Sequence, residues 1–133
     1  MKDLLVVAAV TAAALIVVGA GVGLWHDTTI LVSPPEAVAE QFVRKLATGR
    51  YAVAMEHLDQ RGPAVLERVR SAGSALRARA GAINQVEGEP GAMGAYNAAA
   101  AVVVTTGRAG MIRITFELVR RMGVWRITGW RGV

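Results

Sequence analysis

An uncharged run of 22 residues near the start of the chain, Leu4–Trp25, is the feature that most constrains the fold. A helix rises about 1.5 Å per residue, so this run matches the hydrocarbon core of a bilayer, which is about 30 Å thick. Trp25 stands where an aromatic at the membrane–water interface is expected. The rest of the chain is long enough for one modest hydrophobic core. The sequence therefore predicts a transmembrane anchor at 1–26, a linker at 27–33 and one domain at 34–133.

A cleaved signal peptide is the alternative interpretation of the same run. The apolar part of a signal peptide usually spans about 7–15 residues and precedes a small-residue cleavage site, which here would follow Ala20. The run continues without a charge to Trp25, and this favours an anchor that stays on the protein. Gly19 and Gly23 form a GxxxG pair within it, a spacing that lets a second membrane helix approach closely.

The charges that flank the run predict its orientation. Lys2 and the α-amino group precede it, whereas Asp27 follows it and the next basic residue is Arg44. The positively charged side of a membrane segment usually faces the cytoplasm. We therefore expect a single-pass protein of the inner (cytoplasmic) membrane, with a cytoplasmic N-terminus and a periplasmic or extracellular domain.

Helical patterns come first in this domain. Ser33 is a candidate cap, Pro34 fits the first helical position, and Glu36 completes a possible capping box. Apolar residues then recur every three or four positions until Gly49, a typical stop signal. Two further helices are expected at 50–58 and 63–79.

The apolar period changes to two after the third helix. Alternating apolar residues indicate strands, and the glycine-rich stretch 88–94 is predicted to be a loop. The expected strands cover residues 82–88, 95–106, 111–121 and 124–130. Helices followed by strands define an α+β domain, with about three helices packed on a curved antiparallel sheet of about four strands.

One face of the last two strands is entirely apolar and is predicted to face the helices. Its residues are Ile112, Ile114, Phe116, Leu118, Trp125 and Ile127. Strict alternation places Trp130 on the face opposite to Trp125, where an exposed tryptophan would serve as an anchor for a partner or for lipid headgroups. The alternative is that Trp130 folds over the first helix.

The order of elements and several short motifs resemble the nuclear-transport-factor-2-like superfamily, in particular small membrane-anchored bacterial members with a cystatin-like cone fold. The motifs are Tyr51 after the helix-ending Gly49, an alanine-rich helix, and a Gly-x-Trp-x-Ile strand at 123–127. The resemblance covers 34–130 and implies a cone-shaped domain. Enzymes of this superfamily place Asp, His or Tyr inside the cone to move protons. Here the corresponding strand positions are apolar.

The titratable residues do not form a recognisable catalytic, cofactor or metal site. His57, beside Glu56, is interpreted as a residue that stabilises the end of its helix; a catalytic base would need a carboxylate behind it. His26 lies at the end of the apolar run, too far along the chain from His57 for a zinc motif. The chain has no cysteine. We expect no catalytic residue, no cofactor and no metal.

The net charge of +5 is carried mostly by arginine. This bias fits a GC-rich genome, and it also fits attraction to anionic lipids or acidic partners. The arginines are scattered and outside any nucleic-acid-binding motif, which argues against a nucleic-acid partner. The residues expected at an interface are Trp25, Trp130, Arg120, Arg121, Arg126 and Arg131.

These observations predict a non-catalytic accessory or structural subunit of a bacterial membrane complex. Its partners would be membrane lipid and other membrane protein subunits, with Gly19 and Gly23 in a helix–helix contact. Two alternatives stay open at this point. The domain could be a tethered binding module that holds a small apolar ligand inside the cone, or a cone-fold enzyme.

Overall fold

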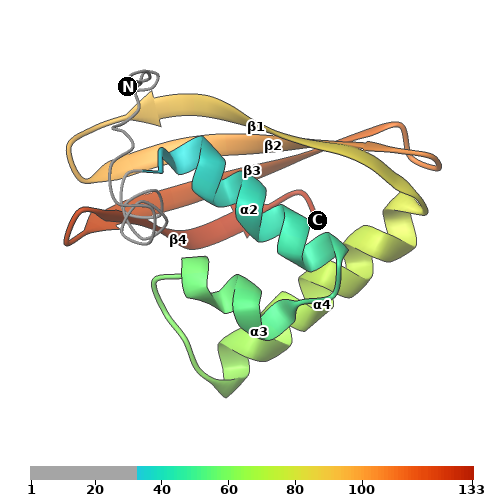
Figure 1. The fold of residues 1–133 in the computed structure, drawn as a ribbon, viewed down its shortest axis with the longest axis horizontal. Helices are drawn as coiled ribbons and strands as arrows, with labels where there is room; N and C mark the ends of the chain where they lie inside the picture. Colours follow the sequence, from blue (N-terminus) through green and yellow to red (C-terminus); the bar gives the residue numbers. More distant parts are fainter. Residues whose placement is uncertain (1–32) are drawn as a thin grey trace, which may run out of the picture. The chain divides into compact units, whose positions relative to one another are not determined.

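The computed structural model describes residues 33–133, of which Pro34–Val133 form one compact unit. The helices are α2 (Pro35–Ala47), α3 (Tyr51–Ala54) and α4 (Pro63–Ala80), with a 3₁₀ turn (Met55–His57) after α3. The strands are β1 (Ile83–Met93), β2 (Asn97–Thr106), β3 (Met111–Arg121) and β4 (Val124–Arg131) (Figure 1). The α+β class with three helices and four antiparallel strands is confirmed.

The expected anchor lies outside the described residues, and so do Gly19, Gly23 and Trp25. Within residues 33–133, no helix is long and apolar enough to cross a membrane.

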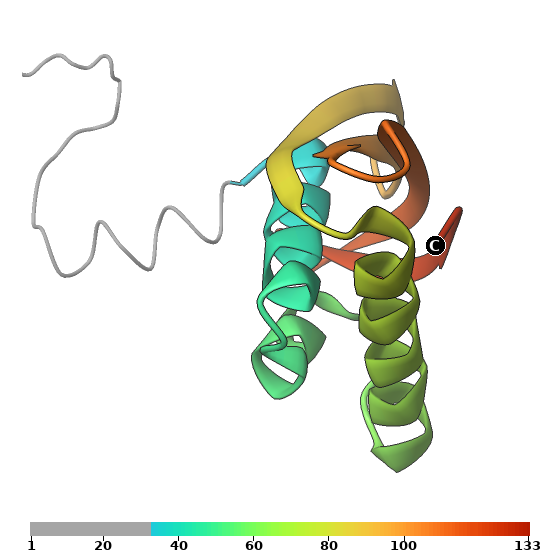
Figure 2. The same ribbon diagram turned by 90° about the vertical axis from the view of Figure 1, so that its right-hand side faces the viewer.

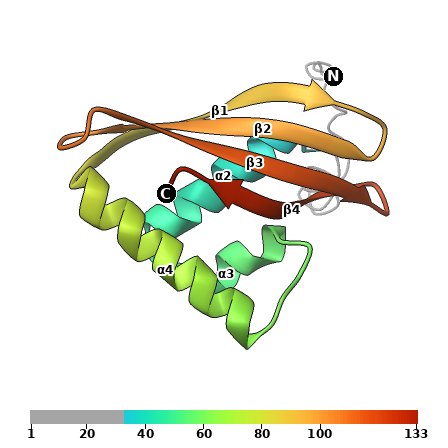
Figure 3. The ribbon, with the colours of Figure 1, turned by 180° about the vertical axis from the view of Figure 1, so that it is seen from behind.

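The sheet is an antiparallel meander in the order β1-β2-β3-β4. Helix α2 packs against β1, β2 and β4, and α4 lies beside α2. Figures 2 and 3 show that the sheet curls over these helices, which all lie on one of its faces. The opposite face is not covered by any other described element.

The core forms between α2 and the sheet because both present an apolar face. The amphipathic α2 buries Val38, Phe42, Val43 and Leu46. The ring of Phe42 meets that of Phe116 edge-on, with centroids 5.9 Å apart, a favourable aromatic geometry. All six apolar residues expected on the helix-facing side of β3 and β4 are at most 6% exposed: Ile112, Ile114, Phe116, Leu118, Trp125 and Ile127.

The predicted helix boundaries need two corrections. Pro34, rather than Ser33, holds the N-cap position, and its side chain makes no cap. A residue before proline is pushed to the extended region, so Pro34 is extended (ψ 164°) and the helix begins at Pro35. The second helix is also shorter than 50–58, because it tightens into a 3₁₀ turn at Met55.

The predicted loop at 88–94 is wrong, because β1 continues to Met93. β1 is an edge strand, where a proline without an N–H is tolerated, and a register shift follows Pro90. Helix α2 protects the outer edge of this strand. The Gly88 N–H donates to Glu40 Oε1 (2.9 Å), and Arg44 donates to the Val86 carbonyl (2.7 Å). These contacts stabilise a strand whose local sequence favours turns.

Candidate functional site

The other edge of the sheet, along β4, is only partly covered. Leu58 makes a parallel bridge with Ile127, and the Asp59 N–H donates to the Ile127 carbonyl (2.9 Å). β4 then continues through Trp130 to Arg131, and no further strand from residues 33–133 lies beside it. An open strand edge with unpaired backbone groups is a natural place for another chain to bind.

Trp130 lies on the same face of the sheet as Phe116, so the expectation from strict alternation is wrong. The pairing of β3 with β4 shifts register between Glu117 and Leu118, and Trp130 then pairs with Phe116. The extra residue in β4 reverses the parity of every position after it. The alternative interpretation, in which Trp130 folds over the first helix, describes this position.

Trp130 is held by one residue from each of two helices. Its ring lies 5.3 Å from the ring of Phe42 in α2. The guanidinium of Arg68 in α4 lies 5.0 Å from the ring centroid, within the range of a cation–π interaction. The tryptophan stays partly exposed. It is therefore anchored in the core at one end and accessible at the other.

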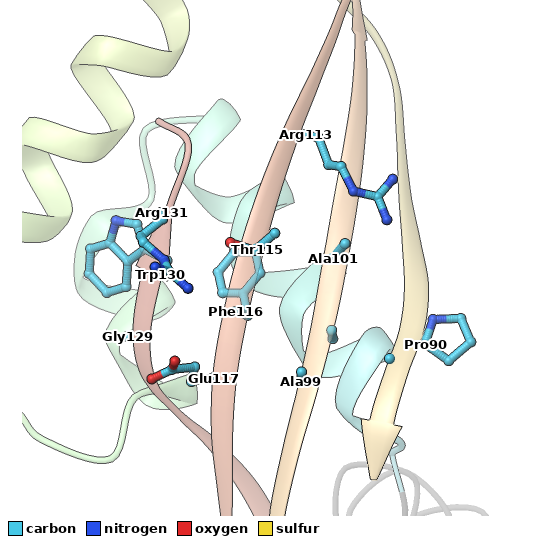
Figure 4. A pocket seen from close by; sticks show the side chains of 12 residues that line it. Pro90, Ala99, Ala101, Arg113, Thr115, Phe116, Glu117, Gly129, Trp130 and Arg131 are labelled. Atoms are coloured by element: carbon cyan, nitrogen blue, oxygen red, sulfur yellow. The ribbon is translucent and has the colours of Figure 1, made fainter.

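Three hollows border Trp130. The first, of about 480 Å³, lies on the outer face of the sheet, opposite to the face that carries the Trp130 ring, and includes Thr115, Glu117 and Gly129 (Figure 4). The hollow forms because residues with small side chains lie next to one another on neighbouring strands there: Gly91, Ala99, Ala101 and Gly129. The second, of about 120 Å³, lies toward Leu58 and Val65. The third, of about 430 Å³, lies along α4 toward Ala75 and Val133. We call Trp130, Arg68, Arg131 and these three hollows the Trp130 surface.

The rim of the Trp130 surface carries charges of both signs. Arg113 pairs with Glu89 at 2.8 Å. Arg131 is exposed and makes no ion pair with any residue in the described range 33–133, and the Glu117 side chain is also exposed. These charged side chains belong to the outer face of the sheet, and the Trp130 ring lies on the helix-facing side of the same strand. Charged residues beside a strand edge are typical of the polar rim of a protein–protein interface.

The other three predicted interface arginines have partners within the domain. The Arg121 guanidinium donates two hydrogen bonds to the Asp59 carboxylate and holds the pKa of that carboxyl below its usual range. Arg126 donates to the Glu56 carbonyl. The Arg120 guanidinium lies 5.9 Å from the Trp125 ring centroid. Arg131 is thus the predicted arginine best placed to meet a partner.

His57 contacts a lysine rather than a carboxylate. Its Nε2 lies 2.7 Å from the Nζ of Lys45. Burial of the imidazole lowers the pKa of His57 to about 4, and the positive charge of Lys45 adds to this effect. Arg126 and Arg61 act in the same direction. His57 is therefore neutral at pH 7 and accepts a hydrogen bond from Lys45. Between residues 33 and 133, no group of three or more His, Asp or Glu side chains is placed to bind a metal.

Acidification is expected to destabilise the domain through His57. The unfolded histidine takes up a proton near pH 6.5 and the folded one near pH 4, so the unfolded state binds more protons in this window and stability falls as the pH falls. Allowing for partial exposure, the loss is about 2 kcal/mol. Urea unfolding followed by circular dichroism at pH 7 and at pH 4.5 measures it.

The matched variant is His57→Gln, which keeps an acceptor for Lys45 but does not titrate. It should flatten the pH dependence between 6.5 and 4, the two pKa values of His57. The hydrogen bond from Arg121 holds the pKa of Asp59 below the ordinary value of 3.8, so the contribution of Asp59 to stability is lost only at more acidic pH. An equal loss of stability in wild type and His57→Gln would show that another group titrates in this window.

No known family model matches the sequence, and a comparison with curated proteins finds no matching relative.

Proposed function

We propose that this protein is a non-catalytic, single-pass membrane protein that acts as an accessory subunit of a bacterial membrane complex. In this proposal residues 1–26 anchor it in the cytoplasmic membrane, with the N-terminus in the cytoplasm. The domain 34–133, on the other side, is a member of the nuclear-transport-factor-2-like superfamily and binds another membrane protein subunit through the Trp130 surface.

The observation that carries this proposal is the position of Trp130. It lies on a partly covered strand edge, is backed by Phe42 and Arg68, and has two hollows on its own side of the sheet. Binding energy at protein interfaces concentrates in tryptophans that are well packed on one side and meet a partner on the other. The exposed Arg131 follows it in the same edge strand with its side chain on the opposite face, so a partner that binds along this edge meets both.

The alternative of a ligand held inside the cone has less support. Such a ligand would lie among Ile114, Phe116 and Trp125, which are all buried in one apolar cluster. The Phe42 side chain occupies the space above Phe116, where the two rings meet edge-on. An enzyme also has less support, because the candidate base His57 is surrounded by cations and has a lowered pKa.

Substitutions in the Trp130 surface test the proposed function. The tagged full-length chain is purified from its host in mild detergent, and a membrane protein that co-purifies in fixed stoichiometry is quantified. Trp130→Ala should reduce its recovery at least tenfold, because loss of a central interface tryptophan costs about 2 kcal/mol or more. Arg131→Glu reverses an exposed charge without changing the core and should also reduce recovery.

Met111→Ala is the matched control, since Met111 is also an exposed apolar residue but belongs to the start of β3. It should leave recovery unchanged. Equal recovery in all three variants would exclude the Trp130 surface as the binding site. A lone chain that co-purifies with bound lipid would favour the ligand-holding alternative.

A further inference from the structure

Two hairpin turns lie at the end of the domain where the chain enters it. Helix α2 runs antiparallel to β1, because Arg44 contacts Val86 whereas the earlier Glu40 contacts Gly88. The start of α2 therefore lies toward the turn that joins β1 to β2 (Figure 1). The turn that joins β3 to β4 is at the same end, and the Arg120 N–H donates to the Tyr96 carbonyl (2.8 Å).

These two turns expose an unusual amount of apolar side chain. Five large apolar residues are exposed within residues 33–133, and three of them lie here: Met93 (62% exposed), Tyr96 (73%) and Met122 (100%). We call these three residues, together with Arg120, the hairpin-tip surface. Single exposed apolar residues are ordinary, but a group of them at one end of a domain marks a contact site.

Met122 is also unfavourable for its own turn. Met122 and Gly123 link the last residue of β3 to the first of β4, and both have positive φ (53° and 82°). Two-residue hairpin turns of this kind favour Asn-Gly or Gly-Gly. A methionine there carries backbone strain, and its fully exposed side chain gains no packing in return. The strain points to a contact outside the domain.

We propose that the hairpin-tip surface inserts into the headgroup layer of an anionic lipid bilayer. This inference rests on the proposed function, in which residues 1–26 cross the membrane. The linker 27–33 then reaches about 25 Å at most, and it joins the domain at this same end. Tyrosine suits the membrane interface, methionine adds apolar surface, and arginine places its charge among anionic headgroups.

The absence of cysteine from the chain allows a direct test with a single spin label. The full-length Met122→Cys protein carries a nitroxide and is reconstituted in vesicles of phosphatidylcholine and phosphatidylglycerol. Its accessibility to oxygen, which partitions into lipid, is compared with that to a water-soluble nickel chelate. Ala109→Cys, exposed in the turn between β2 and β3 at the other end of the sheet, is the matched control.

We expect the label at position 122 to be at least threefold more accessible to oxygen, relative to the chelate, than the label at position 109. This difference should shrink in vesicles of phosphatidylcholine alone. Met122→Asn fits the turn better, so it should fold at least as stably as wild type. The same Met122→Asn substitution is then made in a chain that carries the spin label at Met93→Cys. There it should nevertheless move the label at position 93 out of the lipid and toward water.

The outcomes separate the two proposals. A chain that does not float with vesicles overturns both the anchor and the lipid contact. A chain that floats while the labels at positions 122 and 109 are equally accessible to the chelate overturns only the lipid contact. Equal burial of both labels in lipid also overturns it, because the contact would then not be specific to the hairpin-tip surface.

Discussion

Replacement of Phe42 by alanine is expected to lower the free energy of unfolding by about 4 kcal/mol. Phe42 is fully buried in α2 and contacts the rings of both Phe116 and Trp130. The substitution removes the apolar area of the ring, leaves a cavity between α2 and the sheet, and breaks two aromatic contacts. The loss is a large fraction of the 5–15 kcal/mol that typically stabilises a domain.

Urea unfolding of the full-length protein in mild detergent, followed by circular dichroism, measures this change. Val53→Ala is the control, because Val53 is an exposed apolar residue on α3, and it should shift stability by no more than about 0.5 kcal/mol. A loss below about 1 kcal/mol for Phe42→Ala would mean that α2 does not pack on the sheet through this ring.

Phe42 also connects the core to the candidate site. Its ring packs against the ring of Trp130 from α2, and Arg68 contacts the ring of Trp130 from α4. The partner-binding tryptophan is thus positioned by the same packing that stabilises the fold. A weakened partner contact in Phe42→Ala would follow from this coupling, whereas Arg131→Glu tests the surface without changing the core.

Strong periodicity made the regular elements predictable from sequence. The apolar–polar alternation of 111–121 is interrupted by neither glycine nor proline, and β3 has these bounds. Helix α4 likewise starts at the predicted Pro63. The stretch 88–94 misled the prediction because its glycines and proline locally favour a turn. Pairing with β2 and the contacts from α2 stabilise a strand at these residues. Both involve residues far along the chain, so the local sequence does not indicate them.

The candidate site was only partly predictable for the same reason. Trp130 and Arg131 were recognisable by residue type and position. The side on which Trp130 lies depends on the register shift against Glu117, which comes from strand pairing and not from the alternation within β4. No sequence pattern points to Arg68, because its partner Trp130 lies on a strand far along the chain. The outer hollow needs small residues on neighbouring strands to be aligned, and only the register shows this.

Gly88→Ala is expected to lower the free energy of unfolding by about 3 kcal/mol, the upper range for overpacking. A Cβ at position 88 would clash with the Glu36 carbonyl oxygen and lie 3.3 Å from the Cβ of Glu40. The first of these atoms belongs to the backbone of α2, so it cannot rotate away. The helix must move off β1, and the hydrogen bond from the Gly88 N–H to Glu40 weakens with it.

Gly94→Ala is the matched control, since a Cβ there meets only the Asn97 carbonyl oxygen at 3.5 Å, an ordinary contact. The same urea unfolding should show it within about 0.5 kcal/mol of wild type. Gly88 has no positive φ, so backbone strain does not contribute to the effect of Gly88→Ala. The difference in the free energy of unfolding between the two variants therefore measures how closely α2 packs against β1. If both variants unfold like wild type, α2 does not lie against this strand, and the protection of the β1 edge by Glu40 and Arg44 is wrong as well.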